Sequence, residues 1–369
     1  MNSFVVTATR SMRGYAARVV SHLAKIPGFP GFSEDSNGVE LLETERFADG
    51  EMEVTVGSSI RGREVILFSS SSRNEAGIGV EEAKIELYHT VDALKRSQAG
   101  RIIVFEPYIS CSRSDRTTRR GSVGLWVHIK ILASLGMDHL VTYQLHSDKS
   151  KSMADPAVCA VDDIPALNLL KRYLCDACIR DMATLQKEVR ANWAFCSVDA
   201  GGEKLARGFA DAFGAPLVVA HKQRNYARRN TIESINILSA EPVEGKTLWI
   251  VDDMIDTAGS VESLVRALEP LRPAEINIAA VHAVFSEPAG ARLKEFVETG
   301  RLKRIIVTDT VCGACAMREQ IPNLEIVPSA ELSARIIRTI TANHSMSKLM
   351  RRFDAEMYLK SPNLFNRQE

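Results

Sequence analysis

The sequence predicts an α/β protein in which each domain is a mainly parallel sheet flanked by helices. Short runs rich in Val and Ile recur along the chain, and each is about four to six residues long, as is typical of strands buried on both faces. Segments with apolar residues at helical spacing lie between these runs. This alternation predicts parallel sheets, because parallel strands need a crossover connection that is usually a helix. The length of 369 residues suggests two or three domains or one large one.

The apolar runs that we expect to be strands cover residues 65–68, 102–105, 140–143, 194–198, 217–220, 248–251, 276–281 and 305–307. The first expected helix follows the first run, and its apolar stripe comprises Val80, Ala83, Leu87, Val91 and Leu94, spaced 3, 4, 4 and 3. Similar patterns predict helices over residues 123–135, 166–180, 203–213, 260–271 and 330–340.

The polar stretch 148–163, which contains Pro156, interrupts the alternation. We therefore expect an N-terminal α/β domain over residues 1–155 and a C-terminal α/β domain over residues 156–345. Residues 27–37 are rich in Gly, Pro and Ser and are expected to form a loop. The tail 346–369 is polar, and the sequence leaves open whether it is docked or disordered.

The composition excludes several classes of protein. With 46 Lys+Arg and 46 Asp+Glu the formal net charge is zero, which disfavours bulk electrostatic binding to nucleic acid or anionic membranes. There is no basic patch interleaved with aromatic residues, and no apolar stretch of the roughly 18 residues that cross a bilayer. We expect no nucleic-acid or membrane partner. Seven cysteines and the absence of a leader-like N-terminal run indicate a reduced, cytoplasmic protein.

The segment with the most distinctive chemistry is residues 247–260, TLWIVDDMIDTAGS. An apolar strand ends in Asp252 and Asp253, and an apolar-striped helix follows a short turn. The turn comprises Asp256, Thr257, Ala258, Gly259 and Ser260. Its small residues let backbone amides approach an anion, its hydroxyls can donate hydrogen bonds, and the helix N-terminus favours negative charge. These features predict a phosphate site, and the two acids suit sugar hydroxyls or a divalent ion.

The same pattern is compatible with an ordinary strand–turn–helix in which the acids cap the helix. The complete string favours the phosphate site. It resembles the phosphoribosyl-binding motif of phosphoribosyltransferases and of ribose-phosphate diphosphokinases, which are also called phosphoribosyl diphosphate synthetases.

Further segments favour the diphosphokinases. The segments that resemble this family are residues 47–51 (FADGE), 61–65, 92–96, 107–116, Leu145-His146, 199–202, 221–224 and 307–310. The resemblance extends in unbroken order over roughly residues 4–340, whereas ordinary phosphoribosyltransferases carry only the string 252–260. It implies two phosphoribosyltransferase-like domains and transfer of the β,γ-diphosphate of ATP to the anomeric hydroxyl of ribose 5-phosphate.

The resemblance assigns a role to each matching residue. Lys222 and Arg224 would be catalytic, because they would neutralise charge on the transferred group. His146 and Asp199 would hold Mg²⁺. The residues that would bind ATP are Phe47, Asp49, Glu51, Arg113 and Asp115. The residues that would bind ribose 5-phosphate are Asp252 and Asp253 at its hydroxyls and Asp256, Thr257, Ala258, Gly259 and Ser260 at its phosphate. The family also implies a homo-oligomer, with inorganic phosphate or ADP as possible effectors.

Some positions depart from the family pattern. Ser114 replaces a Gln, Gln144 replaces the Asp two residues before the metal-binding His, and Ala258 stands where Gly is common. A catalytically weak regulatory partner of an active synthetase is therefore an alternative, and a phosphoribosyltransferase is a second. The C-x-x-C pairs at Cys175 and Cys312 are more simply explained as ordinary thiols than as a zinc or redox site, because they are 137 residues apart (312 − 175).

Overall fold

The structure, a computed structural model, describes residues 4–26, 38–117, 120–224 and 232–361, without the side chains of residues 222–224 and 232–234. The chain forms two compact units. The first comprises Met1–Pro165, Thr310–Gly313 and Pro328–Met350, and the second comprises Ala166–Asp309, Ala314–Val327 and Arg351–Glu369. The sequence-based boundaries at 155/156 and 345/346 stay predictions about folding domains.

The first unit contains a five-stranded parallel sheet in the order β1-β4-β5-β6-β7. Its strands are β1 (Phe4–Ala8), β4 (Glu64–Phe68), β5 (Arg101–Glu106), β6 (His139–Tyr143) and β7 (Ala160–Ile164). Its α-helices are α1 (Arg13–Leu23), α2 (Val80–Arg96), α3 (Gly124–Leu135) and α10 (Ala330–Thr341). Short 3₁₀ segments are η1 (Arg10–Met12), η3 (Asp148–Met153) and η8 (Met346–Lys348).

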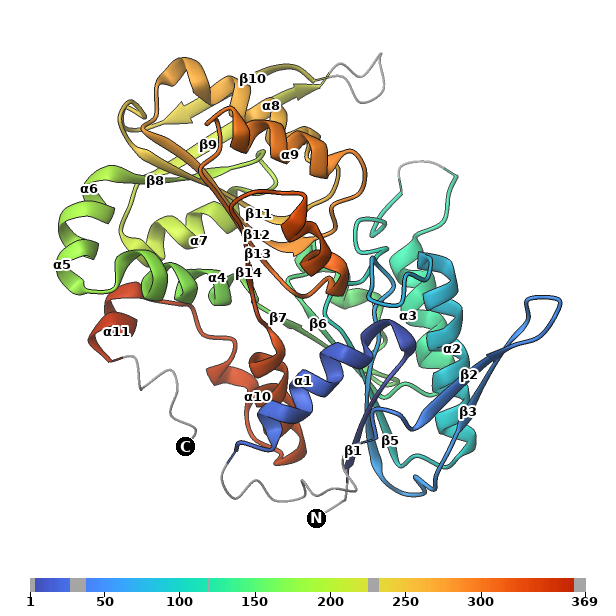
Figure 1. The fold of residues 1–369 in the computed structure, drawn as a ribbon. Coiled ribbons are helices and arrows are strands. Elements are labelled where there is room, and N and C mark those ends of the chain that lie inside the picture. Colours follow the sequence, from blue (N-terminus) through green and yellow to red (C-terminus); the bar gives the residue numbers. More distant parts are fainter. Residues whose placement is uncertain (1–3, 27–37, 118–119, 225–231, 362–369) are drawn as a thin grey trace. The chain divides into compact units, whose positions relative to one another are not determined.

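Helices cover both faces of this sheet (Figure 1). The apolar sides of α2 and α3 form one core with alternate strand residues, including Leu87 and Leu132 against Val65 and Val104. On the other face α1 packs against α10. There the buried Tyr15 hydroxyl lies 2.8 Å from the hydroxyls of both Ser329 and Ser333. Both faces of the strands are therefore buried, which explains their nearly continuous apolar sequence.

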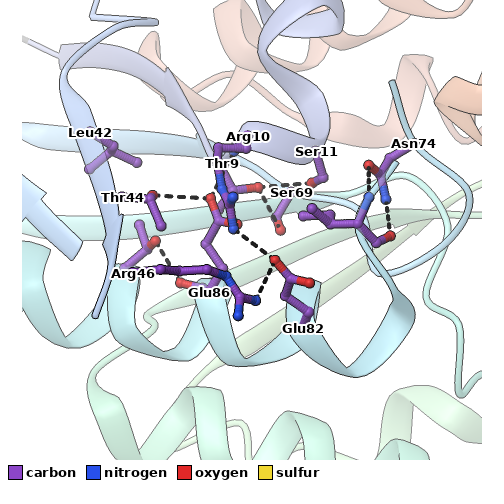
Figure 2. Close-up of polar contacts among 12 residues, drawn as sticks. Thr9, Arg10, Ser11, Leu42, Thr44, Arg46, Ser69, Asn74, Glu82 and Glu86 are labelled. Carbon is purple, nitrogen blue, oxygen red and sulfur yellow. Dashed lines mark hydrogen bonds and ion pairs between the residues drawn. The ribbon is translucent and has the colours of Figure 1, made fainter. Parts of the chain in front are cut away.

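A separate antiparallel hairpin, β2 (Leu42–Arg46) and β3 (Met52–Val56), extends from the first unit. Figure 2 shows how its first strand is held to α2. Arg46 forms an ion pair of 2.7 Å with Glu82, and the Thr44 hydroxyl donates a hydrogen bond of 3.3 Å to Glu86. Glu86 also accepts two hydrogen bonds from Arg10. The hairpin therefore has a polar anchor as well as apolar contacts with the core.

The second unit contains a seven-stranded sheet in the order β10-β9-β8-β11-β12-β13-β14. Its strands are β8 (Trp193–Ser197), β9 (Leu217–Arg224), β10 (Ile232–Ser239), β11 (Thr247–Ile255), β12 (Glu275–Ala283), β13 (Arg304–Thr308) and β14 (Leu324–Val327). Of these pairings, β9 with β10 is antiparallel and the others are parallel. Strand β11, which carries the acid pair, therefore lies in the middle of a mainly parallel sheet.

Helices α8 (Gly259–Leu268) and α9 (Ala289–Glu298) bury their apolar sides in one core of the second unit. On the opposite face α7 (Glu203–Phe213) stacks Phe209 and Phe213 against Phe195 of β8. The shorter segments are α4 (Leu167–Leu174), η4 (Cys175–Ile179), α5 (Met182–Thr184), η5 (Leu185–Val189), α6 (Arg190–Asn192), η6 (Glu269–Leu271), η7 (Cys312–Glu319) and α11 (Ala355–Lys360).

The predicted fold class is confirmed: both units are mainly parallel sheets flanked by helices. No strand was predicted in the polar stretch 148–163, which forms η3 and most of β7. The strands β1, β2, β3, β10 and β14 were also missed.

The tail is docked at least as far as α11, where the buried Tyr358 hydroxyl donates to Asp176 and accepts from Arg172. None of the described helices is both long enough and apolar enough to span a membrane.

Candidate functional site

The acid pair lies towards the carboxyl end of β11, the edge of a parallel sheet at which ligands bind. Asp253 is buried, whereas Asp252 keeps partial exposure. The Asp252 carboxylate accepts a hydrogen bond of 3.0 Å from the backbone N–H of Asp253. Burial and the neighbouring Asp253 and Asp199 carboxylates raise the pKa of Asp252 well above its usual value. The second unit thus brings Asp199, Asp252 and Asp253 close enough for their charges to interact.

Asp199 follows β8, which pairs with β11. Its Oδ1 accepts a hydrogen bond of 3.0 Å from the N–H of Gly202, the residue immediately before α7. This bond fixes the turn that leads into α7. The carboxylates of Asp199, Asp252 and Asp253 place like charges together, and a divalent cation would offset that repulsion. Carboxylate oxygens are ligands that Mg²⁺ accepts, although these described residues do not form a ready-made cluster of metal ligands.

The turn after β11 has an unusual backbone. Ala258, the N-cap of α8, has φ 58° and ψ 9°, in the left-handed region that costs about 1–2 kcal/mol for a residue with a Cβ. Its methyl group is buried in the core of the second unit, which offsets part of that cost. Thr257 and Ser260 are exposed and can donate hydrogen bonds. The N-terminus of α8 adds backbone N–H groups and the positive end of the helix dipole to the same turn.

Arg292 supports this turn from α9, and no motif in the sequence pointed to it. It donates a hydrogen bond of 2.9 Å to the carbonyl oxygen of Thr257, 35 residues earlier. Its Nε lies 3.0 Å from Glu262 in the first turn of α8. A Cβ on Gly259 would lie 3.2 Å from the Arg292 guanidinium, a tight contact. A side chain at position 259 would therefore require the Arg292 guanidinium to shift by a few tenths of an ångström.

The proposed catalytic residues Lys222 and Arg224 belong to β9 by their backbone, where Lys222 pairs with Ile235 and Arg224 with Ile232 of β10. Their side chains lie outside the part of the chain that the structure describes. Their catalytic role stays a prediction.

In the first unit, Phe47, Asp49 and Glu51 occupy the turn of the β2–β3 hairpin. The Phe47 and Glu51 backbones are hydrogen-bonded at 2.9 Å, and the Asp49 carboxylate accepts from the Glu51 N–H at 3.0 Å. Gly50 has φ 93°, which this tight turn requires. Phe47 is 49% exposed, unusual for a large apolar side chain and suited to stacking on a base.

Arg113 and Asp115 lie in the segment 107–116 that follows β5. Arg113 is exposed. Ser114, the departure from the family pattern, has a local role: its hydroxyl oxygen accepts a hydrogen bond of 2.9 Å from the N–H of Gly124 at the start of α3. The Ser114 side chain thus joins this segment to α3.

His146 is exposed and follows β6. Gln144 has φ 45°, and the next N–H, that of Leu145, donates a hydrogen bond of 2.9 Å to Asp163 of β7. A carboxylate therefore holds the backbone before His146, although residue 144 itself is a glutamine. His146 belongs to the first unit and Asp199 to the second. Within the described residues, no cluster of three His, Cys, Asp or Glu side chains forms a ready-made metal site.

The cysteines are free thiols. Cys178 accepts a hydrogen bond of 2.7 Å from Arg304, and burial raises the pKa of Cys175 to about 12. Cys175 and Cys178 belong to the second unit, whereas Cys312 is assigned to the first and Cys315 to the second. These observations agree with ordinary thiols.

The mainly parallel sheet, with an acid pair and a tight turn at the carboxyl end of β11, places the chain in the class of α/β proteins whose ligands bind at this edge of the sheet. Residues 4–136 match the N-terminal domain of ribose phosphate pyrophosphokinase, and residues 173–313 match the phosphoribosyl transferase domain.

Whole proteins match as well. The ribose-phosphate pyrophosphokinase of Fusobacterium nucleatum is 32% identical over 315 residues, 85% of this chain and 91% of that protein. That of Caldanaerobacter subterraneus is 31% identical, with the same coverage. The crystal structure of the phosphoribosylpyrophosphate synthetase from Mycobacterium smegmatis is similar with a TM-score of 0.76, at 27% identity over 93% of this chain and 100% of that one. The chain belongs to the ribose-phosphate pyrophosphokinase family.

Proposed function

We propose that the protein transfers the β,γ-diphosphate of ATP to the anomeric hydroxyl of ribose 5-phosphate, giving 5-phosphoribosyl 1-diphosphate and AMP. The observation that carries this proposal is the geometry of the segment 252–260. Asp252 and Asp253 lie towards the carboxyl end of the central strand β11. The turn that follows leads into α8 and is hydrogen-bonded to Arg292. Family membership over both domains supports the same reaction.

The sugar phosphate is bound by the second unit. Asp252 and Asp253 accept hydrogen bonds from the ribose hydroxyls, which carboxylates do well. The 5-phosphate is held by the backbone N–H groups of the turn and by the Thr257 and Ser260 hydroxyls. Asp256 contributes its backbone, because a carboxylate beside a phosphate would repel it.

In the transfer step the anomeric oxygen attacks the β-phosphorus of ATP in line. The bond from that oxygen to the β-phosphorus forms, the bond from the β-phosphorus to the α,β-bridging oxygen breaks, and the hydroxyl proton is released. Lys222 and Arg224 neutralise charge on the transferred diphosphate. Mg²⁺ would supply further charge neutralisation, and His146 and Asp199 are the residues that would hold it.

ATP is bound by the first unit. The exposed Phe47 ring stacks on adenine, and Asp49 and Glu51 accept hydrogen bonds from its amino group. Arg113 pairs with phosphate oxygens. Asp115 orients Arg113 or the ribose. A homo-oligomer in the cytoplasm, with inorganic phosphate or ADP as effectors and without nucleic-acid or membrane partners, completes the proposal.

A regulatory paralogue of low activity is the second candidate, and the loss of an acid at Gln144 is the observation that favours it. Ser114 argues less for it, because that hydroxyl caps the start of α3. The Asp163 carboxylate that holds Leu145 argues against it.

The test uses the purified protein with ATP, Mg²⁺ and ribose 5-phosphate, and follows AMP and phosphoribosyl diphosphate together. Equal amounts of both products are expected. Lys222→Ala should lower kcat by about 10²–10³-fold, the usual cost of losing a charge-stabilising donor. The exposed Lys294→Ala on α9 is the control and should leave kcat unchanged. Absence of both products, with and without inorganic phosphate, would favour the regulatory paralogue.

A further inference from the structure

A buried Glu–His pair lies at the end of β5, outside the residues that the proposed reaction uses. Glu106, the last residue of β5, is 0% exposed, and His128 of α3 is 1% exposed. The His128 Nε2 and a Glu106 oxygen are 2.6 Å apart. The other imidazole nitrogen, Nδ1, is 2.8 Å from the Tyr88 hydroxyl of α2. Each buried polar group of the pair is therefore hydrogen-bonded.

The second Glu106 oxygen extends this network towards the nucleotide segment. It accepts a hydrogen bond of 3.3 Å from the hydroxyl of Ser71, in the loop after β4. The Ser71 oxygen in turn accepts from Ser110 twice: from the hydroxyl at 3.0 Å and from the backbone N–H at 3.4 Å. Ser110 lies three residues before Arg113. A continuous chain of hydrogen bonds thus runs from α2 and α3 through Glu106 to this segment.

Burying the polar side chains of this network costs free energy, so packing alone does not explain their presence. Residues close in sequence to Glu106 and His128, among them Ile109, Leu125 and Ile129, belong to the apolar core of the first unit. Replacing both partners of a buried hydrogen-bonded pair by apolar groups of the same shape is generally close to neutral for stability. The hydrogen bonds instead fix orientation, because a fully satisfied polar network holds the groups that it joins in one arrangement. The group at its end is the backbone of Ser110.

We propose that Glu106 and His128 are positioning residues for ATP: through Ser71 and Ser110 they hold the segment that carries Arg113 in its nucleotide-binding conformation. This inference rests on the proposed function, since it takes Arg113 as a nucleotide contact. It adds that the affinity for ATP, and not for ribose 5-phosphate, depends on a side-chain pair inside the first unit.

The experiment compares His128→Phe with a matched control, His139→Phe. His139 is also nearly buried and also pairs with a carboxylate, Asp162, at 3.0 Å. It lies at the first residue of β6, the amino end of a strand in the same sheet, so it lies away from the carboxyl-end segment. Both variants remove one His–carboxylate pair. Only the first removes the pair that leads to Ser110.

For His128→Phe we expect the Kd and the KM for ATP to rise about tenfold, with the KM for ribose 5-phosphate within about twofold of the parent protein. His139→Phe should leave all three unchanged. His128→Gln can still donate a hydrogen bond to Glu106, so it should recover most of the ATP affinity. Equal effects of the two Phe variants on ATP, or a parallel rise in both KM values, would overturn the proposal.

Ser71→Ala and Ser110→Ala provide a second route if His128→Phe fails to fold. Each removes a link of the network without leaving a histidine-sized gap, and each should weaken ATP binding in the same direction. Unchanged Kd values for both would overturn the proposal. Because the Kd is measured without turnover, a parent protein that binds ATP but forms no product would refute the proposed reaction while leaving this inference testable. A parent protein that does not bind ATP would refute both.

Discussion

The guanidinium of Arg292, on α9, donates a hydrogen bond of 2.9 Å to the carbonyl oxygen of Thr257, and its Nε lies 3.0 Å from Glu262 on α8. One side chain therefore joins the proposed phosphate turn, the first turn of α8 and the neighbouring helix. The turn includes Ala258 in the left-handed region, a conformation that an isolated segment would rarely hold. Arg292 supplies part of the restraint that keeps it there.

We predict that Arg292→Gln raises the KM for ribose 5-phosphate by about three- to tenfold, with little change in the KM for ATP. The estimate follows from the loss of one hydrogen bond from a charged donor at a partly exposed site. The control is Arg266→Gln. Arg266 also pairs with Glu262, at 3.2 Å, and among the contacts of the described residues it has none with the turn. Steady-state kinetics with each substrate varied in turn provides the measurement, and equal effects of the two substitutions would contradict a specific role for Arg292.

We expect the charge of Asp252 to lower the stability of the folded protein while it favours binding of ribose 5-phosphate. Burial and Asp253 raise the pKa of Asp252. A raised acid pKa stabilises the folded state at low pH, and this contribution is lost as the pH rises through the folded-state pKa. Asp252→Asn removes the charge and keeps the acceptor for the Asp253 N–H. We therefore expect the variant to be more stable than the parent protein at neutral pH and to bind ribose 5-phosphate more weakly.

The pH dependence checks this explanation. The difference in melting temperature between Asp252→Asn and the parent protein should be largest near about pH 8 and should shrink towards about pH 4, where the parent carboxyl is protonated. Each kcal/mol gained corresponds to about 2–4 °C in a domain of this size. The exposed Glu298→Gln on α9 serves as the control and should show no such trend. A difference that grows as the pH falls would contradict the assigned sign.

The elements that the sequence predicted are those with a local signal. Strand β11, its acid pair and the following turn lie in one continuous string, so their spacing alone places them together. Buried strands such as β5 and β12 are nearly continuous apolar runs. Strand β7 was missed because Asp162 and Asp163 make it polar. Its partly exposed residues lie at the edge of the sheet, where an apolar run is not required.

The supporting residues of the site were not predictable for a different reason. Arg292 contacts Thr257, and Asp163 contacts Leu145, across tertiary contacts that join separate strands and helices. A single sequence carries no pattern that pairs such positions. The departure at Gln144 could be seen in the sequence, but the carboxylate that approaches from β7 could only be seen in the fold.

That carboxylate leads to a prediction about Mg²⁺. Asp163 accepts from the Leu145 N–H at 2.9 Å and so fixes the backbone before His146. We expect Asp163→Ala to raise the Mg²⁺ concentration for half-maximal velocity about tenfold, in the usual range for loss of a group that orients a metal ligand. Asp163→Asn retains an acceptor oxygen and should lie much closer to the parent protein.

The control for this prediction lies on the same strand. Asp162→Ala removes a carboxylate that pairs with His139 rather than with the backbone near His146. It should leave the Mg²⁺ dependence unchanged. Direct binding of Mn²⁺, followed by electron paramagnetic resonance, separates metal affinity from turnover. Equal Mn²⁺ affinity in the parent protein and in Asp163→Ala would remove Asp163 from metal binding.

The anchor of the β2–β3 hairpin gives a prediction about stability (Figure 2). Glu86 is 1% exposed and accepts hydrogen bonds from the Arg10 N–H at 2.9 Å and the Arg10 Nε at 3.0 Å. Glu86→Ala leaves these Arg10 donors without their acceptor and should destabilise the protein by about 2–4 kcal/mol, somewhat below the usual cost of breaking a buried pair because Arg10 is partly exposed.

Glu82 is the internal comparison for Glu86, because it pairs with the same arginine, at 3.1 Å, as well as with Arg46. Its side chain is 28% exposed, and water screens its interactions, so Glu82→Ala should cost no more than about 1 kcal/mol. Urea unfolding of both variants provides the measurement, and equal costs would show that burial is not what makes Glu86 important. Since Arg46 directly precedes Phe47, Glu82→Ala should nevertheless raise the KM for ATP more than the KM for ribose 5-phosphate.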